Sequence, residues 1–220
     1  MRALSDLDAA KKRERLAAWD LYPIVDLKPE NCERCGLAVD QMIAGGARVI
    51  QLRIKGASTA RIAETARGVI APCRAAGVAL IVNDDAEACR DADADGLHLG
   101  QGDLSPSVAR RVIGPERILG LSTHSRAQFT AGLREPVDYL AVGPVFDTVN
   151  KANPDPTVGL ELVRWAKSQA DRPVIAIGGI NSMNIRSVID AGADAVAVIG
   201  AVMKSSDIAA AVRSMRAVWI

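Results

Sequence analysis

The chain has 220 residues, 49% of them hydrophobic, and its 27 basic and 26 acidic residues leave a net charge of +1. This is enough apolar material for one large core, whereas the balanced charge and the 3% aromatic content exclude a basic or base-stacking surface for nucleic acid. No apolar stretch approaches the roughly 20 residues that cross a bilayer, and residues 1–19 lack the apolar segment of a signal peptide. We therefore expect a cytoplasmic protein with no membrane partner.

The first 20 residues are charged and rich in alanine, unlike the segments that follow. We expect residues 1–20 to form a helical extension or arm outside the main domain, which then comprises residues 21–220. Trp19 lies at the end of this segment, and its large apolar ring is suited to anchor the extension by covering one end of the domain.

One pattern recurs along the rest of the chain: a helix end marked by Gly or Asp, followed by a short apolar strand. Glycine supplies the left-handed turn that ends a helix, and a continuously apolar run is typical of a parallel strand covered on both faces. Helical spacing separates these runs, for example at 60–75 and 160–169. Eight strands are expected, within residues 21–26, 44–51, 76–82, 93–99, 118–121, 137–143, 173–178 and 192–199.

Eight strand–helix units predict an α/β fold, a single (β/α)8 or TIM barrel. A doubly wound open sheet is the main alternative. Such a sheet usually carries a glycine-rich phosphate loop after its first strand, and Asp26-Leu27-Lys28-Pro29 is not one.

The four cysteines include one C-x-x-C pair, Cys32 and Cys35, at the start of a helical stretch. A zinc site would need a second pair or nearby histidines at short spacing, which the sequence lacks. Redox chemistry at this pair stays open, but reduced thiols packed as small hydrophobic groups suit a cytosolic protein better.

Gln51, Arg53 and Lys55 end the second expected strand. Side chains alternate along a strand, so these three share the face that lines the barrel interior, while Leu52 and Ile54 point outward against helices. Two cations and an amide at a barrel mouth require an anionic partner, and the planar fork of arginine suits a diphosphate. An internal salt bridge to a carboxylate on a neighbouring strand is the alternative.

Carboxylates follow the third and fourth strands. Asn83 and Asp84 end the third strand, and Asp103 lies in the loop after the fourth. Magnesium typically takes one or two carboxylates, keeps several waters and completes its shell with phosphate oxygens, so Asp84 and Asp103 are candidate Mg²⁺ ligands. Asp85 is the neighbouring alternative to Asp84, and either ligand candidate could instead cap the following helix.

The two histidines lie near the fourth and fifth strands. Ser122 follows the fifth strand and can donate to a phosphate oxygen, whereas His124 is open to a catalytic, phosphate-binding or merely structural role. His98 lies inside a strand, where a hydrogen-bonded core histidine is the expected interpretation.

Short donors and glycines follow the last three strands. Thr148, Asn150 and Lys151 come after the sixth, and Gly178-Gly179-Ile180 and Ile199-Gly200 end the seventh and eighth. In barrels the loops after strands seven and eight frequently form a phosphate site from backbone N–H groups. We therefore expect two anionic subsites at one mouth, one cationic and metal-bearing, the other made mainly of backbone amides.

These motifs, in this order, resemble those of the thiamine-phosphate synthase family. The resemblance covers roughly residues 20–215 and is carried by residues 21–26, 51–55, 81–84, 96–103, 120–124, 143–148, 151 and 176–180. It implies a Mg²⁺-dependent transferase on a (β/α)8 barrel. The enzyme would couple 4-amino-2-methyl-5-hydroxymethylpyrimidine diphosphate to a thiazole phosphate, giving thiamine phosphate and pyrophosphate by dissociative loss of pyrophosphate.

The resemblance also implies residue roles. Substrate contacts would fall on Gln51, Leu52, Arg53, Ile54, Lys55, Asn83, Ser122, Thr148, Val149, Asn150, Lys151, Gly179, Ile199 and Gly200. Of these, the thiazole phosphate would lie against Thr148, Asn150, Gly179, Ile199 and Gly200. Catalytic charge stabilisation would come from Arg53, Lys55, Ser122 and Lys151, with Mg²⁺ on Asp84 and Asp103.

Two positions depart from the family pattern, which commonly has Thr or Ser at Asn150 and Ser at Gly200. Both lie on the thiazole side. The alternative functions are a thiazole phosphate tautomerase-like enzyme, which uses a histidine such as His124, and a non-catalytic thiamine phosphate sensor. A homodimer formed through helices is also compatible with the sequence.

Overall fold

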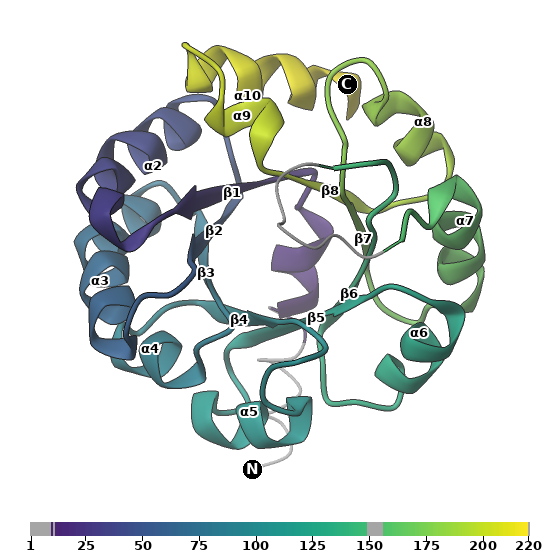
Figure 1. The fold of residues 1–220 in the computed structure, drawn as a ribbon, viewed down its shortest axis with the longest axis horizontal. Coiled ribbons are helices and arrows are strands. Elements are labelled where there is room, and N and C mark those ends of the chain that lie inside the picture. The colour runs from purple at the N-terminus through teal and green to yellow at the C-terminus, as the bar shows by residue number, and fades with distance from the viewer. Residues whose placement is uncertain (1–9, 11, 149–155, 220) are drawn as a thin grey trace.

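The computed structural model describes residues 10, 12–148 and 156–219, and eight parallel strands in it close into one barrel in chain order (Figure 1). The expected (β/α)8 barrel is confirmed, and the open sheet is wrong because β1 and β8 pair with each other. The strands are β1 (Leu21–Leu27), β2 (Val49–Ile54), β3 (Ala79–Asn83), β4 (Gly96–Leu99), β5 (Ile118–Thr123), β6 (Tyr139–Val142), β7 (Val174–Ile177) and β8 (Ala195–Val198).

Helices surround the barrel. Ser58 caps the longest of them by accepting a hydrogen bond from the Arg61 amide (3.3 Å), so this helix begins at Thr59. In the described ranges, no helix is long and apolar enough to span a membrane. The helices are η1 (Pro29–Arg34), α2 (Cys35–Ala44), α3 (Thr59–Ala75), α4 (Ala86–Asp91), α5 (Pro106–Ile113), α6 (Arg126–Gly132), α7 (Gly159–Gln169), α8 (Ile185–Asp190), α9 (Gly200–Met203), α10 (Ile208–Arg216) and η2 (Ala217–Trp219).

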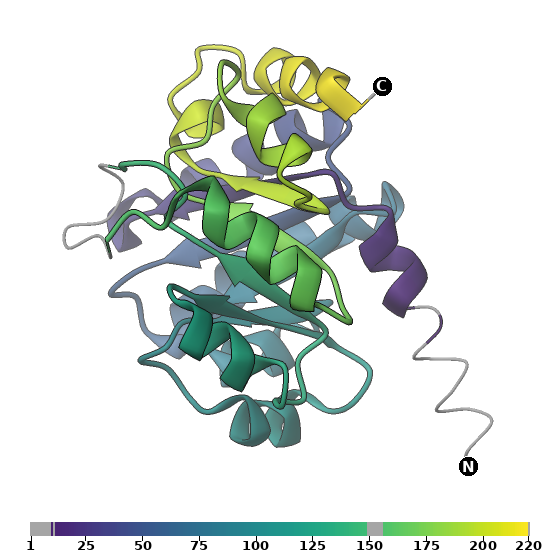
Figure 2. The ribbon, with the colours of Figure 1, turned by 90° about the vertical axis from the view of Figure 1, so that its right-hand side faces the viewer.

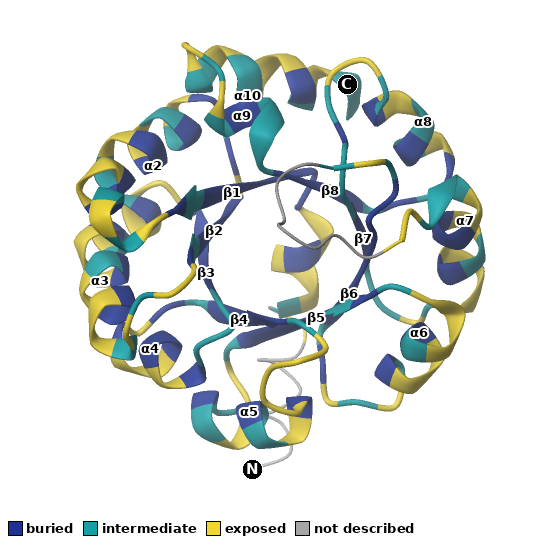
Figure 3. Cartoon of the chain, in the orientation of Figure 1, coloured by how far each residue is buried: buried dark blue, intermediate teal, exposed yellow. Residues whose placement is uncertain are grey.

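The core has two layers, because alternate strand residues face opposite ways. The outer layer lies between strands and helices, and Figure 3 shows the buried sides of helices such as α2, α3 and α7 turned toward the barrel. All four cysteines belong to this layer as free, buried thiols. Burial raises the pKa of Cys35, Cys73 and Cys89 to about 12, so these thiols stay protonated at neutral pH and pack as small hydrophobic groups.

The inner layer fills the barrel itself and includes both tyrosines, Tyr22 and Tyr139. Trp19 lies against both rings, with centroid distances of 5.2 and 5.5 Å, and is only 4% exposed. Residues 12–17 are helical, and Leu16 from this helix is buried in the same layer. Figure 2 places the helix beyond the strand ends at one side of the barrel. The expected anchoring role of Trp19 therefore matches its position.

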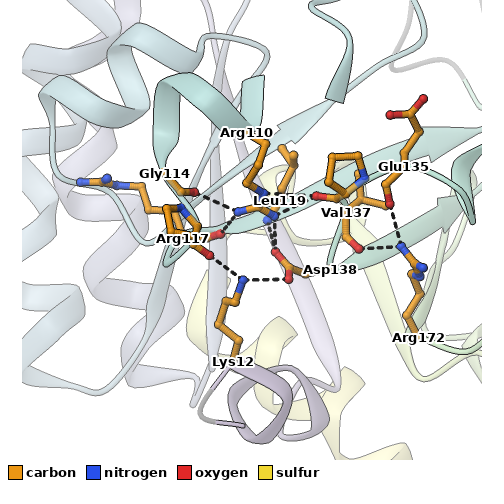
Figure 4. A network of polar contacts seen from close by, with 11 residues as sticks. Lys12, Arg110, Gly114, Arg117, Leu119, Glu135, Val137, Asp138 and Arg172 are labelled. Atoms are coloured by element: carbon orange, nitrogen blue, oxygen red, sulfur yellow. Dashed lines mark hydrogen bonds and ion pairs between the residues drawn. The ribbon is translucent and has the colours of Figure 1, made fainter. Parts of the chain in front are cut away.

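Ion pairs and hydrogen bonds bind this N-terminal helix to the amino ends of the strands. Arg15 pairs with Asp95, just before β4 (2.9 Å), and Lys12 pairs with Asp138, just before β6 (3.0 Å). Asp138 also pairs with Arg110 (2.7 Å) and accepts from the Leu119 amide (2.8 Å), as Figure 4 shows. Asp138 thus joins the N-terminal helix, α5 and β5 at the end of the barrel opposite the predicted mouth.

Gly120 on β5 leaves the space that Tyr139 occupies. A Cβ atom added at Gly120 would lie 2.0 Å from Tyr139 Cζ and 2.4 Å from its hydroxyl oxygen. We expect Gly120→Ala to destabilise the barrel by about 1–3 kcal/mol, because the ring is buried and fully packed. Gly68→Ala on the exposed face of α3 is the control and should stabilise by about 0.5–1 kcal/mol. Urea unfolding measures both, and equal effects would contradict this account.

Candidate active site

A cavity of about 460 Å³ opens at the carboxyl ends of the strands. Most of the predicted site residues line it, which means that loops far apart in the chain converge on one mouth. Those lining it are Gln51, Arg53, Lys55, Asn83, Asp84, Asp103, Ser122, Thr148, Gly179, Ile199 and Gly200. Val149, Asn150 and Lys151 lie outside the described residues. Leu52 and Ile54 are not brought to the cavity, because their side chains pack in the outer layer.

The two cations at the carboxyl end of β2, Arg53 on the strand and Lys55 just after it, both have carboxylate partners. Arg53 is in register with Asp26 of β1 and pairs with it at 2.5 Å. The alternative of an internal salt bridge is therefore present, and yet both side chains keep about a fifth of their surface exposed (17% and 22%), and Arg53 lines the cavity. Lys55, the residue after β2, pairs with Asp84, the residue after β3. Each cation is thus held in place while remaining accessible from the mouth.

The backbone separates the roles of Asp84 and Asp85. Asp85 caps α4, accepting from the Ala88 amide (2.8 Å), and also accepts from the Thr59 hydroxyl (2.7 Å). Asp84 has a left-handed backbone (φ 66°), and its amide donates to the His98 carbonyl (2.8 Å). Asp84 therefore turns its carboxylate into the cavity, and the helix-capping alternative applies to Asp85 instead.

Asp103 reaches the same point from the loop after β4. Its carboxylate accepts from the Gly100 amide (2.7 Å), while Ser105 occupies the N-cap position of α5, so Asp103 does not start that helix. Burial raises the pKa of Asp103, and the neighbouring Asp84 carboxylate, to which it is hydrogen-bonded, raises it further. Two carboxylates in contact repel each other when both are ionised, and a divalent cation between them would remove that cost.

A row of buried polar side chains crosses the barrel beneath the cavity. Gln51 Nε2 donates to the Tyr22 hydroxyl (3.0 Å), which lies 3.2 Å from the Tyr139 hydroxyl. His98 then connects the Tyr139 hydroxyl to Ser122 Oγ, with 2.8 Å at each ring nitrogen. The interpretation of His98 as a hydrogen-bonded core histidine is confirmed. At its other ring nitrogen His98 meets the Tyr139 phenol, in the place where a nucleophilic triad has a carboxylate that stabilises the imidazolium.

Tyr22 and Tyr139 were not predicted from the sequence to be site residues. The signal was present in the strand alternation, since Tyr22 precedes Ile24 and Asp26 on the inward face of β1. Gln101 was missed as well, and its amide donates to the Ser122 carbonyl (2.7 Å), which fixes the loop after β4 beside β5.

The loops after β5 to β8 form the other side of the cavity. His124 Nδ1 donates to the Gly143 carbonyl (2.6 Å), which fixes the ring orientation. Gly179 has φ 65°, and a Cβ there would lie 2.5 Å from the Asp147 carbonyl oxygen, so only glycine fits. Gly200 begins α9 immediately after β8, and the first amides of a helix have no carbonyl within that helix to bond. Such amides suit a phosphate.

A cluster of three or more His, Cys, Asp or Glu side chains suited to a metal ion is absent from the described part of the chain. The pair of Asp84 and Asp103 is smaller than such a cluster. It can serve a cation only with waters or ligand oxygens completing the shell, which is the usual arrangement for Mg²⁺.

Comparison with known proteins gives a consistent result. The family model described as thiamine monophosphate synthase matches residues 21–202. The thiamine-phosphate synthase of Chloroflexus aurantiacus is 40% identical over 199 residues, covering 90% of this chain and 92% of its own. That of Syntrophomonas wolfei is 41% identical over 181 residues, covering 82% and 87%. The solved thiamine phosphate pyrophosphorylase of Pyrococcus furiosus superposes with a TM-score of 0.82 at 33% identity, covering 94% of this chain and 96% of its own.

Proposed function

Since the chain belongs to the thiamine monophosphate synthase family, a family of transferases in thiamine biosynthesis, we propose that the cavity described above is where its two substrates meet. The reaction couples an aminopyrimidine methyl diphosphate to a thiazole phosphate and yields thiamine phosphate and pyrophosphate. The proposal assigns the diphosphate to the side of the cavity formed by β2 to β5 and the thiazole phosphate to the side formed by β6 to β8.

The observation that carries the proposal is the contact between the carboxylates of Asp84 and Asp103, with Lys55 beside them. Burial raises the pKa of Asp103 and the adjoining Asp84 carboxylate raises it further, and two adjoining carboxylates are a suitable environment for Mg²⁺. When bound, Mg²⁺ would neutralise charge on the diphosphate oxygens. Asp84 and Asp103 would be its protein ligands, with diphosphate oxygens and water as the others.

The protein's own cations would stabilise the leaving group. In the proposed step the bond between the methylene carbon and the diphosphate oxygen breaks, and its electron pair leaves with pyrophosphate. Arg53 and Lys55 stabilise the charge that builds on those oxygens, as does Lys151, which lies outside the described residues. Ser122 and Asn83 add hydrogen bonds to the same group.

The thiazole completes the reaction. The lone pair on its ring nitrogen forms the new carbon–nitrogen bond with the pyrimidine methylene cation, so no protein nucleophile is required. Gly179, Ile199 and Gly200 would hold the thiazole phosphate through backbone amides, together with Thr148 and Asn150. Holding both substrates in line supplies much of the remaining rate increase.

We expect the purified protein to form thiamine phosphate only when both precursors and Mg²⁺ are present. Product analysis by chromatography, with and without a chelator, measures this directly. Consumption of the thiazole phosphate alone, without the diphosphate, would instead indicate the tautomerase-like alternative. Tight binding of thiamine phosphate without any turnover would indicate a sensor.

A further inference from the structure

The buried polar row, formed by Gln51, Tyr22, Tyr139, His98 and Ser122, has both of its ends at the cavity. Gln51 lies on β2 and Ser122 on β5, with β3 and β4 between these strands in the barrel wall. Between the two ends of the row, Tyr22 and Tyr139 lie in the barrel interior and His98 also lines the cavity. Each end can donate or accept a hydrogen bond toward a ligand. What one end offers depends on how the protons are arranged along the row.

Proton accounting leaves few arrangements. Burial raises the pKa of Tyr22 and of Tyr139 well above the usual value for a phenol, so each keeps its single proton at neutral pH. A neutral imidazole carries one donor and one acceptor nitrogen. Within the row, each phenol therefore donates one hydrogen bond and accepts one, and His98 does the same.

Two arrangements satisfy the whole row. In the first, Gln51 Nε2 donates to Tyr22, Tyr22 to Tyr139, Tyr139 to His98 Nδ1, and His98 Nε2 to Ser122, which leaves the Ser122 proton for the ligand. In the second, every bond reverses: Ser122 donates into the row, and Gln51 Oε1 accepts from Tyr22. A mixed arrangement would leave a buried proton or lone pair without a partner, at the cost of an unmade hydrogen bond.

We propose that this row is a specificity device that links the hydrogen-bonding character of Gln51 to that of Ser122, with Tyr22, Tyr139 and His98 as positioning residues. The proposal rests on the proposed function, in which an anionic diphosphate meets Ser122. An anion only accepts, so Ser122 must donate to it, and this selects the first arrangement. Gln51 then has its Nε2 committed to Tyr22 and offers Oε1 to the cavity. The ligand should therefore carry a hydrogen-bond donor, such as an amino group, on the side that faces β2.

Packing keeps the row in place. The rings of His98 and Tyr139 are stacked with centroids 5.6 Å apart, and Trp19 lies against the edge of Tyr139. On the β5 side, the Tyr139 ring lies so close to Gly120 that a Cβ there would be 2.0 Å from Tyr139 Cζ. The hydroxyl positions are thus fixed by packing, and only the protons can rearrange.

The tautomer of His98 gives the first test. The chain contains two histidines, so ¹⁵N-histidine NMR yields two imidazoles, and His124→Asn identifies the signals of His98. With the aminopyrimidine diphosphate and Mg²⁺ bound and no thiazole present, we expect His98 to carry its proton on Nε2 alone. A proton on Nδ1 alone, or on both nitrogens, would overturn the proposal.

The binding preference gives the second test. Calorimetry would compare the aminopyrimidine diphosphate with its 4-oxo analogue, which places a carbonyl oxygen where the amino group was. We expect the wild type to prefer the amino ligand by about tenfold or more, because the oxo oxygen would face Gln51 Oε1. In Tyr139→Phe, Tyr22 can donate to Gln51, the amide can turn, and the preference should fall by about tenfold. Tyr22→Phe should reduce it as well.

Thr123→Val is the matched control. It removes a buried hydroxyl from the residue after Ser122, one that bonds the Ala141 carbonyl (2.9 Å) and takes no part in the row. Thr123→Val should prefer the amino ligand over the 4-oxo analogue as strongly as the wild type does. If the wild type, Tyr139→Phe and Tyr22→Phe all showed the same preference, the proposal would be overturned. Failure of the proposed function would be seen separately, as the absence of thiamine phosphate when the wild type receives both precursors.

Discussion

Asp84→Asn is expected to lower turnover by about 10²- to 10³-fold while leaving the barrel folded. The substitution removes one of the two adjoining carboxylates, so the site loses half of its charge for Mg²⁺. Asparagine tolerates the left-handed backbone found at this position (φ 66°), which alanine would strain. Initial rates over a Mg²⁺ titration measure the effect, and the concentration of Mg²⁺ that gives half-maximal rate should rise.

Asp85→Asn is the matched control, because it makes the same change of charge one residue away. Asparagine keeps the capping bond to the Ala88 amide, so α4 should remain intact. We expect turnover and Mg²⁺ dependence close to those of the wild type. If Asp85→Asn lost the Mg²⁺ response and Asp84→Asn kept it, the metal assignment would have to move by one residue.

Arg53→Met has the second largest expected effect, a loss of about 10²- to 10³-fold in turnover, because it removes a cation from the proposed diphosphate subsite. It should also lower the free energy of unfolding by about 1–2 kcal/mol, since Asp26 is left without its partner. This is less than for a fully buried pair, because both side chains are partly exposed. Steady-state kinetics and urea unfolding measure the two effects separately.

The double variant Asp26→Asn with Arg53→Met separates a structural from a functional role for Arg53. Removing both charges should restore most of the stability, because no carboxylate is left unpaired. Turnover should stay low, because the cation is still missing. Recovery of activity together with stability would mean that Arg53 serves only to hold Asp26, as the salt-bridge alternative states.

The barrel could be predicted from the sequence because its strands are covered on both faces. Runs such as Val174–Ile177 and Ala195–Val198 are continuously apolar, and Gly192 (φ 98°) marks the helix end before the second of them. The expected helical stretches 60–75 and 160–169 each begin one residue later than the observed helices α3 and α7. The exact first residue depends on the local geometry of the cap, as at Ser58.

The candidate site was predictable in its position but not in its partners. Strand alternation alone placed Gln51, Arg53 and Lys55 on one face, and they line the cavity. The pair of Arg53 with Asp26 depends on the register between β1 and β2, which a sequence does not state. The buried row likewise depends on side chains from five strands meeting across the barrel interior, and no spacing within one strand reveals that.

The covered amino end of the barrel determines how substrates enter and products leave. Trp19 and Leu16 pack against the inner core on the side away from the cavity. Ion pairs of Arg15 and Lys12 hold their helix to the amino ends of the strands, so this end of the barrel is covered. Molecules that enter the cavity at the carboxyl end of the barrel therefore leave through the same opening. Two substrates arriving and two products departing therefore share a single gate, and the order in which they pass it becomes part of the catalytic cycle.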